Sequence, residues 1–340
     1  MPTFFAPPSP PVELLRVHDA FLSRVDHGPL RTMNPPFRWL RGAVYDATGK
    51  LVEQSQKLGG VNGNNWVPAD PGRMKPPKNA ERLEGTWLYG GHWIQHFGHF
   101  IIETITTLWP EDHQVDGLVF HKYLKRPWSV DDWQSRLLEH VGYGGLPVRV
   151  ADGRHALVVD ELLVPSRAVV SGGWAHAEAI TVWDRVRSRV GAGTSSPSRV
   201  FLSRSGHNLS VDPDSRKSRS SRERDAALDR VFSSAGFDVV RPEELAIDRQ
   251  VELAAHADVL AGSSGSALHL SAFSPSSTRV IEIGDERSPD APIALQLVVD
   301  AARGHRHAFV AHGTHVSDLP RILAELDAGQ VPSGSGLESP

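Results

Sequence analysis

The second half of the chain alternates short apolar runs with longer segments whose apolar residues recur at helical spacing. Such short runs are typical of buried strands in a parallel sheet, and the longer segments are typical of amphipathic helices. The pattern predicts strands over residues 199–203, 237–240, 259–261, 280–283 and 307–310, and helices over 222–235, 248–257, from 267 onward, 292–303 and 316–328. Because strands and helices alternate, we expect βαβ units and a parallel sheet.

The first half is less regular. It predicts strands over residues 42–45, 51–54, 83–89, 117–121, 148–150, 156–159 and 161–164, and helices over 91–109, 129–142 and 175–190. The stretch 191–198 is rich in Gly and Ser, which is typical of a linker. We therefore expect an N-terminal domain over residues 1–190 and a C-terminal domain over 199–340. The last helix is expected either in the C-terminal domain or packed back on the N-terminal one.

Composition narrows the class of protein. The 340 residues are 40% hydrophobic and 22% charged, which is ordinary for a globular protein. The formal net charge of −4 argues against nucleic acid as a partner. The absence of cysteine excludes disulfides, thiolate catalysis and Cys-based metal sites, and it fits a reducing cytoplasm. No signal peptide is recognisable, and no apolar run approaches the ~20 residues of a membrane span. We expect a cytoplasmic protein whose membrane contact, if any, is peripheral.

A turn of small residues follows the predicted strand 259–261. It consists of Gly262, Ser263, Ser264, Gly265 and Ser266. A strand, a small-residue turn and a helix start together present backbone N–H groups to an anion, and the helix dipole adds to the attraction. Many such turns are small for steric reasons only, so this pattern alone leaves a packing role open.

Arg204 directly follows the predicted strand 199–203. Ligands of parallel sheets bind at the carboxyl ends of the strands, where a guanidinium group can hold phosphate through two hydrogen bonds. The Ser-rich loop beyond Arg204 carries more cations, and most of such a run is normally a solvated face. Lys217 and Arg222 from this run are candidate contacts. Two anion-binding features at one sheet edge predict a phosphate site.

A polar stripe lies in the predicted helix 91–109. His92, His96, His99 and Glu103 follow one another at intervals of four, three and four residues, so on a helix they share one face. Zinc binding is one interpretation, but the His-Glu-x-x-His arrangement is absent and four groups along three turns are too spread out for one tetrahedral ion. The alternatives are histidines bonded to the backbone, and a polar site in which an imidazole and a carboxylate move protons.

Three blocks of sequence stand out: His-Phe-Gly-His-Phe-Ile-Ile-Glu at residues 96–103, Val-Phe-Leu-Ser-Arg at residues 200–204, and a longer stretch over residues 235–283. Together they resemble glycosyltransferase family 61, which includes capsular-polysaccharide, xylosyl- and N-acetylglucosaminyltransferases. The resemblance implies an α/β, GT-B-like fold, with two Rossmann-like domains that face each other across a cleft. It also implies inverting transfer without an obligatory metal or cofactor. The donor would be a nucleotide sugar, a UDP-sugar, and the acceptor the hydroxyl of a polysaccharide, a glycolipid or a small molecule.

The resemblance also implies roles for the candidate residues. The turn at 262–266 and Arg204 would hold the donor diphosphate, and the C-terminal domain would carry most of the donor contacts. Glu282 would bond the ribose hydroxyls, or else be an exposed charge at a strand end. In the N-terminal, acceptor-side domain, Glu103, His96 or His99 would be the general base.

Two departures from the family pattern fall near the expected donor site. The family usually has Gly-x-His-Gly where this chain has Ser264 in place of the histidine, and its Arg…Asn-Glu block lacks the asparagine at residues 222–225. Ser264 therefore leaves open a non-catalytic homologue that binds nucleotide sugars. The histidines of the predicted helix 91–109 leave open a third function, that of a His-based metallohydrolase.

Overall fold

The computed structural model describes residues 9–24, 26–30, 37–57, 70–111, 113–123, 129–151, 156–191, 197–209 and 219–329. The chain divides into two compact units, one ending at Arg185 and one beginning at Val186. This division falls within helix α3 (Ala177–Val190), a few residues before the predicted linker. The two-domain assignment with its linker at 191–198, and the GT-B arrangement, remain predictions.

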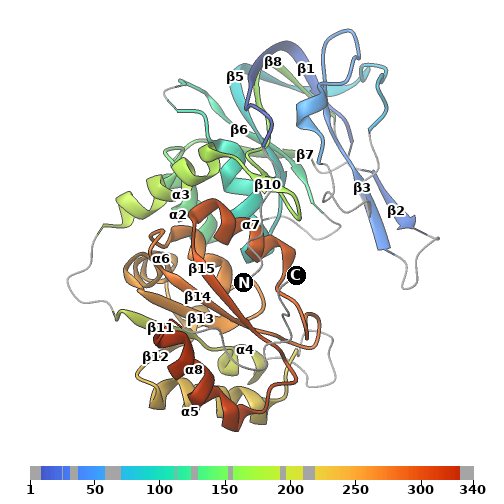
Figure 1. Cartoon of the computed structure of the whole chain (residues 1–340). Coiled ribbons are helices and arrows are strands. Elements are labelled where there is room, and N and C mark those ends of the chain that lie inside the picture. Colours follow the sequence, from blue (N-terminus) through green and yellow to red (C-terminus); the bar gives the residue numbers. More distant parts are fainter. Residues whose placement is uncertain are drawn as a thin grey trace. The chain divides into compact units, whose positions relative to one another are not determined.

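The C-terminal unit is built on a five-stranded parallel sheet (Figure 1). Its strands are β11 (Arg199–Leu202), β12 (Asp238–Val240), β13 (Val259–Ser263), β14 (Arg279–Ile283) and β15 (Arg306–Val310). All neighbours pair in parallel, in the order β12-β11-β13-β14-β15. The predicted parallel sheet is therefore confirmed. The strand order reverses between β11 and β13, and this is the switch point where ligands of doubly wound sheets bind.

Helices connect these strands as the pattern predicted. They are α4 (Ser205–Leu209), α5 (Arg222–Ser234), η4 (Pro242–Glu244), α6 (Ile247–His256), η5 (Leu268–Phe273), α7 (Ala294–Arg303), η6 (Val316–Asp318) and α8 (Leu319–Asp327). The predicted helix after residue 267 is only the six-residue 3-10 segment η5. The side chain of Ser221 caps α5 by accepting a hydrogen bond from the Arg224 N–H.

Helices α5 and α8 cover one face of this sheet, and α6 and α7 lie on the other (Figure 1). In the core, Phe232 of α5 stacks on Phe201 of β11, with ring centroids 4.0 Å apart, and meets Phe237 edge-on at 5.0 Å. Ile322 and Leu326 of α8 belong to the same buried cluster. The last helix therefore packs within its own unit.

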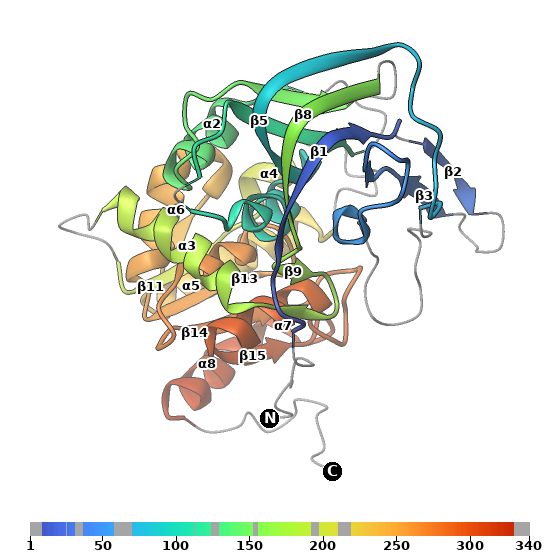
Figure 2. The ribbon, with the colours of Figure 1, turned by 90° about the horizontal axis from the view of Figure 1, so that it is seen from above.

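The N-terminal unit contains a six-stranded mixed sheet with the order β4-β1-β8-β5-β6-β7. These strands are β1 (Leu14–Leu22), β4 (Val44–Tyr45), β5 (Ala80–Trp93), β6 (Gly117–Lys122), β7 (Val148–Ala151) and β8 (Ala156–Pro165). Strands β5 to β8 run parallel, and β1 pairs antiparallel with both β8 and β4. Figure 2 shows β5, β8 and β1 side by side. The antiparallel edge distinguishes this sheet from a purely doubly wound one.

Shorter elements complete this unit. They are β2 (Asp26–Leu30), β3 (Phe37–Arg41), β9 (Val169–Val170), β10 (Trp174–Ala175), η1 (Glu53–Ser55), α1 (Phe97–His99), the π-helix η2 (Phe100–Thr104), η3 (Ile105–Leu108) and α2 (Asp132–His140). Three details of the prediction were wrong. A 3-10 turn replaces the strand expected at 51–54, β8 is one continuous strand, and β1 was not foreseen.

The start of the predicted helix 91–109 was also wrong. Strand β5 continues through the two glycines at 90 and 91, and His92 pairs with His121 of β6. A Cβ atom on Gly90 would lie 1.9 Å from Cε1 of Phe120, so glycine is needed there for close packing and does not end the strand. Gly91 adopts φ +77°, and the register of β5 against β6 shifts between Tyr89 and His92, which changes the direction of the strand. The helical segment begins only at Phe97.

The aromatic stack under α5 predicts a large loss of stability on truncation. Phe232→Ala should lower the free energy of unfolding of the C-terminal unit by about 3–5 kcal/mol, since it removes a fully buried ring that two others contact. Urea denaturation followed by circular dichroism measures this loss. Ser233→Ala, at the exposed neighbouring position, is the control and should change little. Equal stabilities of the two variants would contradict the packing described.

Candidate functional site

Three arginine side chains converge on the turn after β13. A Cβ atom on Gly265 would lie 3.2 Å from Nη1 of Arg204, 3.2 Å from Nη1 of Arg219 and 3.6 Å from Nη2 of Arg287. Arg204 follows β11 and Gly265 follows β13, and these two strands form the switch point of the sheet. Gly265 itself has φ +145°, a conformation that other residues rarely adopt. Glycine thus leaves the space that the three guanidinium groups surround.

This arginine cluster (Arg204, Arg219 and Arg287) gathers three guanidinium groups in a partly buried place. Burial lowers the pKa of Arg204, and Arg287 adds to that effect, while Asp285 opposes it. Burial and the two other arginines lower the pKa of Arg219 to about 10. Arg287 is bonded to Asp285, with Nη2 to Oδ2 at 2.9 Å. Asp225 and Glu243 also attract Arg204, whereas Arg219 is repelled by both other guanidinium groups and attracted by Asp285. A bound anion would relieve the remaining repulsion.

Unsatisfied donors support the same interpretation. The Nε atoms of Arg204 and Arg219 are buried and have no hydrogen-bond partner in the part of the chain that the structure describes. A buried N–H group without an acceptor is costly, so such groups usually face a ligand or water. Phosphate oxygens are acceptors that match the geometry of a guanidinium group. The cluster therefore has the charge and the donors that a phosphate or diphosphate requires.

The turn itself contributes less than the sequence suggested. The Ser264 N–H donates to the carbonyl oxygen of Ile283 at 2.8 Å, so the sheet already uses it. The carbonyl oxygen of Ser264 accepts from Nη2 of Arg287 at 3.3 Å. The segment η5 that follows is a short 3-10 helix, so the expected helix-dipole contribution is not available. The positive charge of this site comes from the arginine side chains.

Glu282 is fully buried. Its Oε1 accepts from the Ser264 hydroxyl at 2.6 Å and from the Ile293 N–H at 3.2 Å, and its Oε2 lies 3.3 Å from Nε2 of His307. The expectation of an exposed strand-end charge is therefore wrong. A ribose would reach this carboxylate only by displacing its partners, and we do not retain Glu282 among the donor contacts.

The two candidates from the Ser-rich loop have different outcomes. Lys217 lies outside the described residues. Arg222 is the exposed first residue of α5, and its role stays a prediction. The sequence reasoning gave Arg219 no role apart from the charged run and missed Arg287 altogether. A signal for Arg287 was present, because it follows β14, whose carboxyl end lies beside that of β13.

A second polar cluster lies in the N-terminal unit. Nζ of Lys57 contacts Oε1 of Glu103 at 2.6 Å, and Nδ1 of His99 is hydrogen-bonded to Oε2 of the same carboxylate. Lys57 and Glu103 are 7% and 5% exposed, whereas the His99 side chain is 39% exposed. If Nδ1–H donates to the carboxylate, the neutral ring carries no proton on Nε2. We call these three residues the Lys57–Glu103–His99 cluster.

The charges within this cluster assign different roles to its members. Burial would raise the pKa of Glu103, but Lys57 and the hydrogen bond from His99 outweigh it and hold that pKa well below its usual range. Burial lowers the pKa of Lys57, and Glu103 partly offsets this effect. Glu103 is therefore an ionised acceptor that orients His99, and it is too weak a base to take a proton near neutral pH. His99 is the better base.

The other two histidines of the predicted stripe separate. His96 is exposed just before α1, and its ring centroid lies 5.3 Å from that of His99. His92 belongs to β5, is buried, and accepts a hydrogen bond on Nδ1 from Nη2 of Arg167 at 2.8 Å. The prediction that all four groups share one helix face was therefore wrong. Within the described residues, no three His, Asp or Glu side chains are grouped as metal ligands would be.

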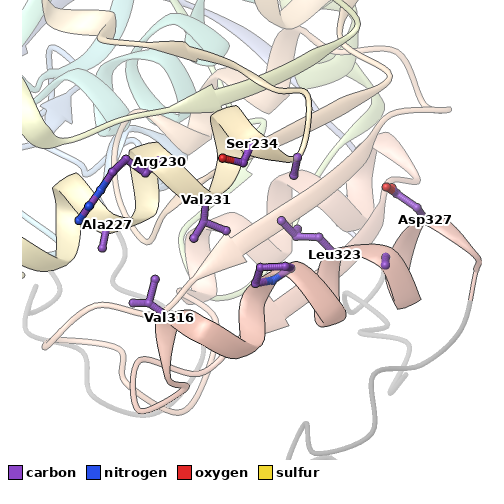
Figure 3. A pocket seen from close by; sticks show the side chains of 10 residues that line it. Ala227, Arg230, Val231, Ser234, Val316, Leu323 and Asp327 are labelled. Carbon is purple, nitrogen blue, oxygen red and sulfur yellow. The ribbon is translucent and has the colours of Figure 1, made fainter.

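A pocket of about 600 Å³ lies between α5 and α8 of the C-terminal unit (Figure 3). Its lining consists of Ala227, Arg230, Val231, Ser234, Ala235, Val316, Pro320, Leu323, Ala324 and Asp327. None of the described candidate residues is among them. The lining is mainly apolar, so this pocket does not have the chemistry expected for a diphosphate.

The fold is mixed α/β, with one parallel and one mixed sheet, and an arginine cluster lies at the switch point of the parallel one. The family model of Glycosyltransferase 61 matches residues 97–281, which is more than half of the chain. The chain belongs to the Glycosyltransferase 61 family, and it is accordingly a glycosyltransferase. The match includes His99, Glu103, Arg204 and the turn at 262–266.

No curated protein matches the chain. No helix in the described residues is long and apolar enough to cross a membrane.

The buried ion pair predicts a strongly non-additive effect on stability. Lys57→Met should destabilise the N-terminal unit by about 3–5 kcal/mol, because Glu103 would remain buried without its counter-ion. The double variant Lys57→Met/Glu103→Leu should lose much less stability, since neither of the two buried charges remains. Urea denaturation followed by tryptophan fluorescence measures this unit selectively, because all nine tryptophans precede residue 186.

Lys78→Met, at an exposed position, is the control for this comparison of single and double variants.

The same ion pair predicts a pH dependence. Folding lowers the pKa of Glu103, so its ionised form stabilises the protein at any pH above the unfolded pKa near 4.5. This stabilisation is lost as the pH falls through the folded pKa. The difference between wild type and Lys57→Met should therefore shrink in strong acid. Additive effects of the two substitutions would contradict the ion pair.

Proposed function

We propose that this protein transfers a sugar from a UDP-sugar to a hydroxyl group of a polysaccharide, glycolipid or small-molecule acceptor, with inversion and without a metal ion. The observation that carries the proposal is the convergence of Arg204, Arg219 and Arg287 around Gly265 at the switch point. Membership of the Glycosyltransferase 61 family supplies the class of reaction.

The arginine cluster would hold the donor diphosphate. Negative charge grows on the diphosphate as the bond from the anomeric carbon to the phosphate oxygen breaks, and fixed guanidinium groups stabilise that charge in the transition state. Metal-independent transferases need protein cations for this purpose. The unpartnered Nε atoms of Arg204 and Arg219 would donate to phosphate oxygens. The carboxylate of Asp285 would keep Arg287 in place.

His99 would act as the general base. In an inverting transfer, the acceptor oxygen bonds to the anomeric carbon from the side opposite the leaving diphosphate and gives its proton to the base. Nε2 of His99 would take that proton, and Glu103 would stabilise the imidazolium through Nδ1. Lys57 would keep Glu103 ionised. This assignment selects His99 among the three candidate bases, with Glu103 as its positioning residue.

The donor site predicts a loss of UDP affinity on arginine removal. Arg204→Ala and Arg219→Ala should each weaken UDP binding by about tenfold or more, as the loss of a charge-assisted hydrogen bond does. Isothermal titration calorimetry measures the dissociation constants. Arg230→Ala is the matched control, because it removes one positive charge from α5 at the separate apolar pocket. Unchanged affinity in Arg204→Ala and Arg219→Ala would rule out the proposed cradle.

The base assignment predicts a selective loss of turnover. His99→Asn should lower kcat by about 10²-fold or more, and Glu103→Gln should also lower it, since the ring then loses its orientation. UDP binding should be unchanged in both variants. His96→Asn is the comparison, and it should retain turnover. If His99→Asn retains turnover and His96→Asn does not, His96 is the base. UDP binding by the wild type without turnover on any of a panel of nucleotide sugars and acceptors would favour the non-catalytic homologue.

A further inference from the structure

A chain of buried polar groups begins at Ser264 and runs through the C-terminal unit. The Ser264 hydroxyl donates to Oε1 of Glu282 at 2.6 Å, and Oε2 of Glu282 lies 3.3 Å from Nε2 of His307. Nδ1 of His307 lies 3.3 Å from Oδ2 of Asp300, and Nδ1 of His305 lies 2.9 Å from Oδ1 of Asp300. Ser264, Glu282 and Asp300 are at most 2% exposed. The mechanism proposed above uses none of these residues.

His307 is the shared counter-ion of two buried carboxylates. Buried carboxylates are costly unless a cation or several hydrogen bonds satisfy them. His307 bridges Glu282 on β14 and Asp300 on α7 from its place on β15. Burial lowers the pKa of His307, but these two carboxylates outweigh it and raise the pKa above its ordinary value. The imidazolium form is therefore favoured.

The remaining polar groups around this bridge are on α7, η5 and the start of β15. His305 and the amide of Gln296 both contact Asp300, and His269 contacts Gln296. Arg303, also on α7, donates from Nε to the carbonyl oxygen of Ala272. His305 thus resembles His307 in burial and in contacting Asp300, but only His307 forms an ion pair with Glu282 in the part of the chain that the structure describes.

Ser264 connects this buried chain to the arginine cluster. Its hydroxyl is held by Glu282, its N–H by Ile283 and its carbonyl oxygen by Arg287. Gly265, on which the three arginines converge, is the next residue. Any change in the charge of Glu282 therefore acts on Ser264, and through it on the placement of Gly265 and Arg287.

We propose that His307 is a positioning residue of the anion site, which it holds in its binding geometry through Glu282 and Ser264. This inference rests on the proposed donor site. When His307 loses its proton, Glu282 and Asp300 repel each other without a bridging cation. Glu282 then moves away from Asp300, and its hydrogen bond from Ser264 weakens. The turn loses its fixed geometry, and anions bind less tightly.

The sign of the pH dependence follows from the direction of the shift. Because folding raises the pKa of His307, the stabilisation is complete below the unfolded value near 6.5 and is lost as the pH rises through the folded value. Anion affinity should therefore fall at alkaline pH in the wild type. In His307→Gln, the bridging charge is absent at every pH.

The experiment measures binding of inorganic pyrophosphate by calorimetry from pH 6 to pH 9 in the wild type, His307→Gln and the control His305→Gln. The ionisation of pyrophosphate changes with pH in the same way for all three proteins. The ratio of each variant's Kd to the wild-type Kd therefore isolates the pH dependence that comes from the protein. For His307→Gln this ratio should be about 10 at pH 6, as expected when one charge-assisted hydrogen bond, that between Ser264 and Glu282, is weakened. It should approach one at pH 9, where the wild-type His307 has also lost its charge. For His305→Gln the ratio should not vary with pH.

A second measurement links the effect to Ser264. In a Ser264→Ala background, His307→Gln should have little further effect on pyrophosphate binding, because the connecting hydroxyl is gone. NMR titration of the His307 ring in the wild type should give a pKa above 6.5. A ratio for His307→Gln that is flat with pH, equal ratios for the two histidine variants, or additive effects with Ser264→Ala would each overturn the proposal.

These outcomes are distinct from failure of the proposed function. Pyrophosphate binding with the expected pH dependence, in a protein that transfers no sugar, would leave His307 in its positioning role and refute only the transfer. Sugar transfer with a flat ratio would refute only the role of His307. If the wild type binds no pyrophosphate at any pH, both the donor site and this inference fail.

Discussion

Repulsion among three guanidinium groups is the constraint on which the proposed donor site depends. Arg204, Arg219 and Arg287 come from three different segments, yet all lie around Gly265. Burial first, and then the like charges of Arg287 and Arg204, lower the pKa of Arg219. Asp285 holds Arg287 in this arrangement, Asp225 and Glu243 also attract Arg204, and a glycine leaves room between the groups. Such a cluster is most stable with an anion bound.

The rest of the C-terminal unit supports this cluster. The parallel sheet brings the ends of β11, β13 and β14 to one edge, and the buried chain from Ser264 to His307 fixes the turn between β13 and η5. In the N-terminal unit a different electrostatic arrangement serves a different purpose. There Lys57 neutralises Glu103, which leaves His99 oriented and partly exposed. One unit thus gathers three guanidinium groups at a sheet edge, and the other holds a buried ion pair with an attached imidazole.

Sequence periodicity was reliable where each element had a simple environment. Strands buried on both faces read as apolar runs, so β11, β13, β14 and β15 were recognisable, and Arg204 could be placed at a strand end. It failed where tertiary packing overrode local preference. The two glycines at 90 and 91 look like a strand end, but the ring of Phe120 occupies the space beside Gly90, and β5 continues to Trp93. His92 was therefore assigned to the wrong element, and the four-residue stripe was an artefact of that assignment.

By itself, the sequence determined the parallel α/β class of the C-terminal unit and the family, and it singled out Arg204, His99 and Glu103 as candidates, because local periodicity and short motifs carry that information. Only the tertiary structure brought Arg219 and Arg287 to Gly265, paired Lys57 with Glu103, and buried Glu282 against Ser264 and His307. These contacts join residues far apart in the chain. Their charges and pKa values depend on burial and on through-space neighbours, which spacing along a sequence does not encode.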